Sequence, residues 1–126
     1  MPKKIIQTLE APAPIGPYNQ AILAGDTLYV SGQIAIDVAS GELLTDNITQ
    51  ETHQVMKNLE AILRTTKMQF SNVVKCSIFV RDMGKFATIN EAYGQYFPAD
   101  PPARETVEVS GLPKNVNVEI SCIAVK

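Results

Sequence analysis

The chain has 126 residues, of which 45% are hydrophobic and 19% are charged, and its formal net charge is −2. This length fits one domain over residues 1–126. The lysines and arginines of this acidic chain are scattered, which argues against nucleic acid as the main partner, because phosphate binding needs a concentrated basic surface. The charged share lies below the usual ~25%, which points weakly to surface covered by other subunits.

The sequence gives no support for a membrane span, a secretory signal or a metal site. No apolar run approaches the roughly 18 residues that a membrane helix needs, and residues 1–10 lack a hydrophobic leader. The two cysteines, Cys76 and Cys122, stand inside apolar runs and provide neither metal-ligand spacing nor a disulfide framework. We therefore expect a cytoplasmic protein with two buried free thiols, no membrane partner and no metal.

The first third of the chain predicts a stiff loop followed by a strand. Three prolines within residues 12–17 exclude helix, so this loop presents Tyr18 and Asn19. Apolar residues then alternate with others over residues 28–36, which indicates a strand with one core-facing side. The alternating apolar residues are Leu28, Val30, Ile34 and Ile36.

Two helices are expected, one on each side of a buried strand at residues 73–80. The first runs over residues 48–67 behind a capping-box pattern at Asn47 and Gln50, and it carries His53 on its solvated polar stripe. The second begins after Asp82 and ends at Pro98. Its core-facing stripe consists of Phe86, Ile89, Tyr93 and Phe97.

The last third predicts a hairpin between residues 104–109 and 116–125, joined by a loop with turn-forming residues. Pairing Val109 with Val116 places the valines on a core-facing side. Arg104, Thr106 and Glu119 then share the opposite face.

This constellation has two interpretations. One is a surface ion pair, worth only about 0–1 kcal/mol. The other is a site in which Arg104 binds a planar carboxylate through a bidentate contact while Glu119 handles a proton. Periodicity alone favours the surface ion pair, because an acidic side chain beside an arginine is common on sheet surfaces. The functional interpretation requires a partly desolvated site, and therefore a covering loop or a subunit interface.

Five segments resemble the Rid family (reactive intermediate deaminases, also called YjgF), in this order and spacing. The resemblance covers about residues 15–125. The segments are Pro14-Ile-Gly-Pro-Tyr18, Leu28-Tyr-Val-Ser-Gly-Gln33, Phe86-Ala-Thr-Ile-Asn90, Pro102-Ala-Arg104 and Leu112-Pro-Lys-Asn-Val-Asn-Val-Glu119.

The resemblance implies a chorismate-mutase-like α+β fold, a mixed sheet with two helices on one face. It also implies a homotrimer with a barrel-like core of sheets and a cleft at each subunit interface, and no metal or organic cofactor. The implied activity is hydrolysis of 2-imino acids such as 2-iminobutanoate and 2-iminopropanoate to 2-keto acids and ammonia. Arg104 matches the carboxylate-binding arginine, and Glu119 matches the glutamate that positions the water. Four further residues match positions that line or support the cleft, namely Tyr18, Ser31, Gly32 and Asn90.

The chain departs from the familiar family pattern at two positions. Thr106 stands where many members carry a cysteine that lines the cleft, so thiol chemistry is excluded there. Ser121 replaces an acidic residue that is often found at its position. Two other functions remain alternatives to the deaminase: a non-catalytic trimer that binds metabolites in the same cleft, and a ribonuclease or translation inhibitor.

Overall fold

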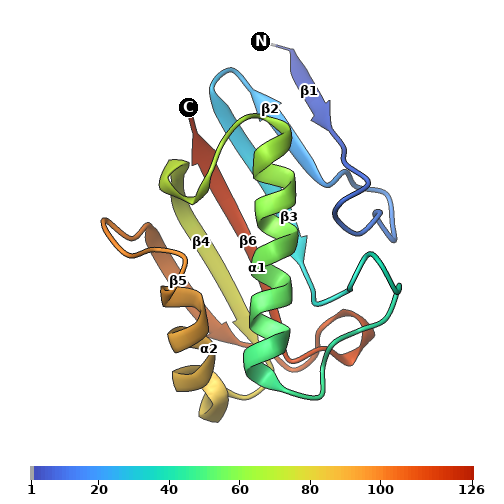
Figure 1. Ribbon diagram of the computed structural model, residues 1–126, viewed down its shortest axis with the longest axis vertical. Coiled ribbons are helices and arrows are strands. Elements are labelled where there is room, and N and C mark those ends of the chain that lie inside the picture. Colours follow the sequence, from blue (N-terminus) through green and yellow to red (C-terminus); the bar gives the residue numbers. More distant parts are fainter. Residues whose placement is uncertain (1) are drawn as a thin grey trace.

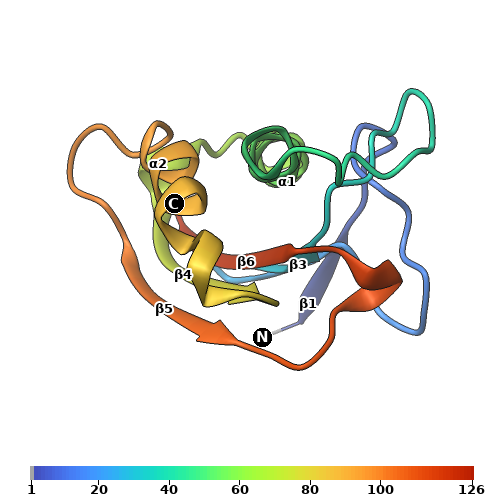
Figure 2. The same ribbon diagram turned by 90° about the horizontal axis from the view of Figure 1, so that it is seen from below.

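The computed structural model describes residues 2–126, whose strands form one sheet of six in the order β1-β2-β3-β6-β4-β5. Both helices lie on the same face of this sheet, as Figures 1 and 2 show. The expected α+β class, a mixed sheet with two helices on one face, is therefore confirmed. The elements are β1 (Lys3–Ile6), β2 (Ala21–Ala24), β3 (Thr27–Gln33), α1 (Ile48–Thr65), β4 (Val73–Val80), α2 (Phe86–Gly94), β5 (Ala103–Glu108) and β6 (Val118–Val125).

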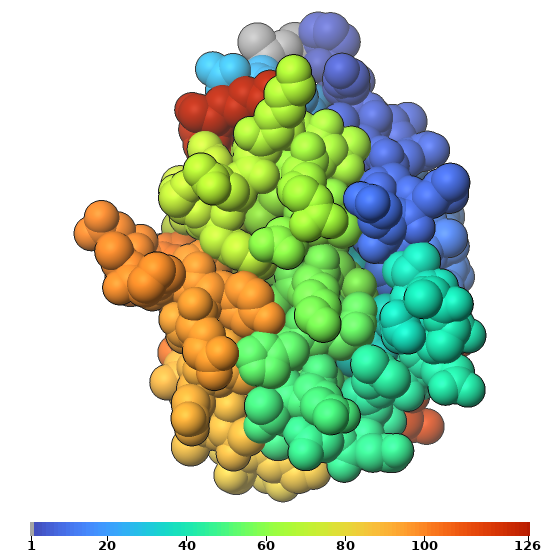
Figure 3. All heavy atoms as spheres, in the orientation of Figure 1, coloured from blue at the N-terminus to red at the C-terminus, as the bar shows by residue number. Residues whose placement is uncertain are grey.

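Helix α1 begins where its capping pattern predicts. The side-chain oxygen of Asn47 accepts a hydrogen bond from the backbone N–H of Gln50, which satisfies one of the free donors of the first turn. Its apolar stripe packs on the sheet, and Leu59 at its centre is fully buried. The helix ends at Thr65, two residues before the expected end. In Figure 3 it runs down the middle of the helix-bearing face, with α2 beside it.

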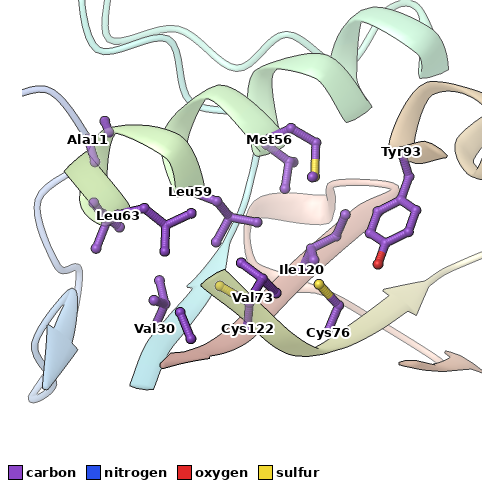
Figure 4. Packing of buried hydrophobic residues seen from close by; sticks show 14 of the residues in the cluster. Ala11, Val30, Met56, Leu59, Leu63, Val73, Cys76, Tyr93, Ile120 and Cys122 are labelled. Carbon is purple, nitrogen blue, oxygen red and sulfur yellow. The ribbon is translucent and has the colours of Figure 1, made fainter. Parts of the chain in front are cut away.

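The core lies between the helices and the sheet (Figure 4). Met56 and Leu59 point from α1 toward Ile120 on β6. Cys76 on β4 and Cys122 on β6 are register partners, and both are buried free thiols, as expected from their apolar surroundings. Burial raises the pKa of both thiols above their ordinary value, so both stay protonated near neutral pH.

Strand β3 contains a bulge that the alternating pattern did not reveal. Its pairing with β6 shifts between Val30 and Gln33, so one extra residue lies on β3. As a result, Gln33 is buried although the pattern placed it on the opposite side from Val30. The bulged residues are Ser31 and Gly32, and a bulge often re-aims side chains next to a functional site.

The predicted C-terminal hairpin is wrong. β5 pairs in parallel with β4, and β6 pairs antiparallel with both β4 and β3, so β4 separates the two strands that were expected to pair. Val107 consequently lies on the face without helices and is 42% exposed, whereas Val118 is buried under the helices. The turn residues of the 109–117 loop are compatible with a hairpin, but they do not exclude a longer connection around β4.

The polar stripe of α1 and the end of α2 also differ from expectation. His53 is not a solvated bystander, because its Nδ1 lies 2.8 Å from the hydroxyl of Tyr96 and the ring is half-buried. α2 ends at Gly94, four residues before the expected stop at Pro98. Phe86 lies outside the core, although Ile89, Tyr93 and Phe97 are buried as predicted.

The sheet face without helices carries apolar side chains that no element covers. Ile5 is 50% exposed and Tyr29 is 49% exposed. Register partners place them in one row across the sheet with Ile22 and Ile123. Half-buried Phe79 and its partner Val107 lie on the same face. Contiguous exposed apolar surface of this kind is typical of protein interaction sites. No helix among residues 2–126 is long and apolar enough to cross a membrane.

Candidate active site

The carboxylate of Glu119 lies in a cavity of about 340 Å³ on the face away from the helices. The cavity is lined by Ile15, Tyr18, Ser31, Gly32, Ile34, Pro113 and Glu119. Burial raises the pKa of Glu119 above its ordinary value of 4.5, because a partly desolvated carboxylate is harder to ionise. Such a group exchanges a proton more readily near neutral pH than an exposed glutamate does.

Gly32 makes room for this carboxylate. A Cβ atom at this position would collide with Glu119 Oε2 and would lie only 2.8 Å from its Cδ. The glycine of the β3 bulge therefore leaves free the space that the Glu119 side chain occupies, and a Cβ atom there would push the end of that side chain aside.

The proline-rich loop is fixed against the bulge through Ser31. The Ser31 hydroxyl donates a 2.6 Å hydrogen bond to the carbonyl of Asn19, and the Ser31 N–H donates to the carbonyl of Gln20. Within the loop, the backbone N–H of Ile15 donates to the Tyr18 hydroxyl. Tyr18 and Ile15 are thus held at the mouth of the Glu119 cavity.

Arg104 lies in a second cavity, of about 460 Å³, at the side of α2. Its guanidinium group is 5.2 Å from the ring centre of Phe86 and 5.2 Å from that of Tyr93, so two aromatic rings flank the cation. Its Nη1 donates a 2.7 Å hydrogen bond to Asn90 Oδ1. The lining residues are Asn90, Tyr93, Gly94, Phe97, Pro101, Pro102 and Arg104.

Two buried hydroxyl groups, on β5 and on α2, have no hydrogen-bond partner among residues 2–126. They belong to Thr106, two residues after Arg104 on β5, and to Tyr93 on α2. Burial raises the pKa of Tyr93, so its hydroxyl stays protonated. In Figure 4 this hydroxyl points from α2 toward the sheet near Cys76.

The two charged residues do not share a face of the sheet, and this corrects the expectation from the hairpin. Arg104 is the register partner of Cys76, a core residue under the helices. Glu119 is the register partner of Phe79, whose side chain lies on the other face. The structure therefore groups Tyr18, Ser31 and Gly32 with Glu119, and groups Asn90 with Arg104, in two separate half-sites.

The sequence analysis missed Phe86 and Tyr93 as neighbours of Arg104. Both were assigned to the core because they recur at helical spacing with Ile89. The signal that could have identified them is Asn90, a polar residue at the i+4 position from Phe86 and so on the same side of α2. Among residues 2–126, no group of three His, Cys, Asp or Glu side chains could hold a metal ion.

Known proteins resemble this chain over nearly its whole length. Residues 8–126 match the protein family described as Endoribonuclease L-PSP. A RutC family protein of Pyrococcus horikoshii is 47% identical over 98% of both chains. The 2-iminobutanoate/2-iminopropanoate deaminase of Bos taurus is 44% identical over 98% of this chain and 90% of its own. A crystal structure of a Yersinia pestis protein of unknown function from the conserved Rid family has a TM-score of 0.96 at 42% identity, covering 99% of this chain and all of that one.

The raised pKa of Glu119 predicts a dependence of stability on pH. The folded state holds this proton more tightly than the unfolded state, so the contribution of Glu119 to stability is full below pH 4.5 and is lost as pH rises through the raised pKa. Glu119→Gln does not titrate. The unfolding free energy of the wild type minus that of Glu119→Gln should therefore fall as pH increases, as measured by urea denaturation from about pH 4 to about pH 7. A difference that is constant with pH would contradict the burial of this carboxylate.

Proposed function

Because the chain belongs to the Rid (YjgF) family, we propose that it hydrolyses 2-imino acids to 2-keto acids and ammonia, in a cleft that two subunits of a homotrimer build together. The substrates would be small species such as 2-iminobutanoate and 2-iminopropanoate. The observation that carries this proposal is the separation of Arg104 and Glu119 into complementary half-sites on opposite faces of one sheet. The deaminase name of a relative that is 44% identical supports the reaction class.

Arg104 is suited to hold the carboxylate of the substrate. A guanidinium group has five N–H donors in a planar fork, and the side chain of Asn90 occupies one of them. No carboxylate of residues 2–126 forms a salt bridge with Arg104. The rings of Phe86 and Tyr93 restrict the orientation of the fork, so the remaining donors are available for a bidentate contact.

Glu119 is suited to activate water. In the proposed reaction it accepts a proton from a water molecule while the oxygen of this water attacks the imine carbon of the substrate. Glu119 then gives this proton to the nitrogen, which produces a carbinolamine. In a second transfer Glu119 takes the proton of the carbinol hydroxyl and passes it to the amino group. The C–N bond then breaks, and ammonia leaves as the C=O bond of the 2-keto acid forms. Burial raises the pKa of Glu119, so this group accepts a proton from water more readily than an exposed glutamate does and can donate it again.

The uncovered apolar face supports an assembly that brings the half-sites together. Ile5, Tyr29 and Val107 are each more than 40% exposed on this face. Subunits that pack these faces around a threefold axis would form the barrel-like core expected for this family. Glu119 opens onto the same face, so the Arg104 cavity of a neighbouring subunit can meet it at the edge of that core.

A non-catalytic metabolite-binding trimer would use the same Arg104 cavity, and only Glu119 separates the two functions. A binding protein has no need of a carboxylate with a raised pKa facing the ligand.

The family description also names an endoribonuclease. Against that activity, the only histidine, His53, lines neither cavity, and the net charge of −2 disfavours RNA. RNA cleavage that survived purification and vanished in His53→Ala would contradict our preference.

The deaminase proposal is tested by coupling the purified protein to a threonine dehydratase, with semicarbazide as a trap for free imine. We expect the wild type to raise 2-ketobutyrate release and to suppress semicarbazone formation. Glu119→Gln should lower turnover by about 10²–10⁴-fold while 2-ketobutyrate still binds. Arg104→Ala should lose both turnover and binding, and Lys57→Ala, on an exposed part of α1, is the matched cation control. Unchanged turnover in Glu119→Gln would refute the mechanism.

Gly32→Ala should displace the Glu119 carboxylate without unfolding the chain. We expect turnover to fall by at least about tenfold, since a misplacement of one ångström costs up to about 10²-fold. The same assay and a circular dichroism spectrum measure the two effects. Gly111→Ala is the matched control, because a Cβ at that position meets no atom within 4 Å. Equal activity of the two variants would show that the close approach of Gly32 to Glu119 is unimportant.

Mixing two inactive variants tests whether the site is shared between subunits. Arg104→Ala and Glu119→Gln subunits, unfolded together at equal amounts and refolded, should regain about one quarter of wild-type activity, because random trimers complete about one site in four. Each variant refolded alone is the control. If mixing restores no activity although mass spectrometry shows mixed trimers, both residues must act from the same subunit.

A further inference from the structure

Glu51 is a fully buried carboxylate that neither half-site contains. It lies in the first turn of α1, is 0% exposed, and belongs to the largest fully buried side chains of the described residues. No lysine, arginine or histidine of residues 2–126 forms a salt bridge with it. An isolated buried carboxylate is costly, so its retention requires strong compensating hydrogen bonds.

Three N–H groups at the start of β6 supply this compensation. Glu51 Oε2 accepts hydrogen bonds from the backbone N–H of Asn117 at 2.7 Å and from that of Val118 at 3.2 Å. Glu51 Oε1 accepts a third from the side-chain amide of Asn117 at 2.7 Å. Hydrogen bonds to an ionised acceptor are roughly twice as strong as those between neutral groups. All three donors immediately precede Glu119 in the chain.

The segment held in this way needs an external support. Lys114 and Asn115 have φ values of 55° and 59°, in the left-handed region that is costly for residues other than glycine. Pro113 of the same segment lines the cavity of Glu119. A second attachment comes from the backbone N–H of Arg81, which donates to the carbonyl of Asn117.

We propose that Glu51 is a positioning residue, whose buried carboxylate fixes the start of β6 and thereby the place of Pro113 and Glu119 in their half-site. This inference rests on the proposed function for its kinetic consequence. Arg104 lies in the other half-site and is not attached to Glu51. Loss of the Glu51 contacts should therefore impair water activation and leave the carboxylate anchor intact.

The kinetic test uses Glu51→Leu, which removes all three acceptor contacts but keeps an apolar side chain of similar size. We expect kcat to fall by about 10²-fold, while KM and the Kd of 2-ketobutyrate change by less than about twofold, since binding energy at Arg104 is retained. Asn117→Ala removes only the side-chain contact and should give an intermediate kcat.

Glu51→Gln is the conservative variant and should rescue kcat. Its side-chain oxygen accepts hydrogen bonds from the two backbone N–H groups. Its NH₂ group donates to the side-chain oxygen of Asn117 after the Asn117 amide group has rotated so that its oxygen and nitrogen exchange places. Thr52→Val is the matched control, because Thr52 is equally buried on the same turn but its hydroxyl bonds only to the carbonyl of Ile48. It should lower the melting temperature without changing kcat.

A second readout does not depend on activity. In Glu51→Leu, carboxyl NMR should show the pKa of Glu119 moving down toward its ordinary 4.5, because a displaced β6 start exposes the group to solvent. Thr52→Val should leave it unchanged. Unaltered kcat and titration in Glu51→Leu, a Glu51→Gln variant as impaired as Glu51→Leu, or an equal effect of Thr52→Val would each overturn the inference. A wild type without deaminase activity would overturn the proposed function alone, because the titration still tests Glu51.

Discussion

The pairing of β5 and β6 with the two sides of β4 determines where both charged groups of the candidate site lie. Register partners in neighbouring strands point to the same side of a sheet, so the pairing with Cys76 turns Arg104 toward α2. The antiparallel pairing of β6 on the other side of β4 turns Glu119 away from the helices. In the proposed function, one chain therefore presents an anchor for an anion on one side and a proton-transfer group on the other. A second chain would then place the two around one small molecule.

The sequence predicted those elements whose cause is local. The capping side chain of Asn47, the 3.6-residue stripe of α1 and the β-branched run of β4 each depend on contacts within a few residues, and each is found where expected. Pairing between strands is not local. The pattern of Arg104, Thr106 and Glu119 fits a hairpin as well as it fits the observed crossover around β4, since both satisfy the turn chemistry of the loop. The bulge at Ser31 and Gly32 escaped for a related reason, because one extra residue reverses the alternation on which the strand prediction relied.

Two carboxylates near the start of β6 differ in how deeply they are buried and in which hydrogen bonds they accept. Glu51 is the more deeply buried and accepts hydrogen bonds from three N–H donors. Glu119 is half-buried, and its pKa is raised by burial alone. The group with satisfied hydrogen bonds provides a fixed scaffold, whereas the one that lacks them keeps its capacity to exchange a proton.

The close contact between Gly32 and Glu119 couples the effects of substitutions at two positions that are far apart in the chain. Any side chain at residue 32 would occupy the volume that the carboxylate fills, so a larger residue there is compatible only with a shorter or redirected acid at residue 119. A substitution at residue 32 therefore moves the Glu119 side chain unless residue 119 changes as well. A substitution that would be harmless elsewhere on β3 therefore changes, at residue 32, the position of the Glu119 carboxylate on β6.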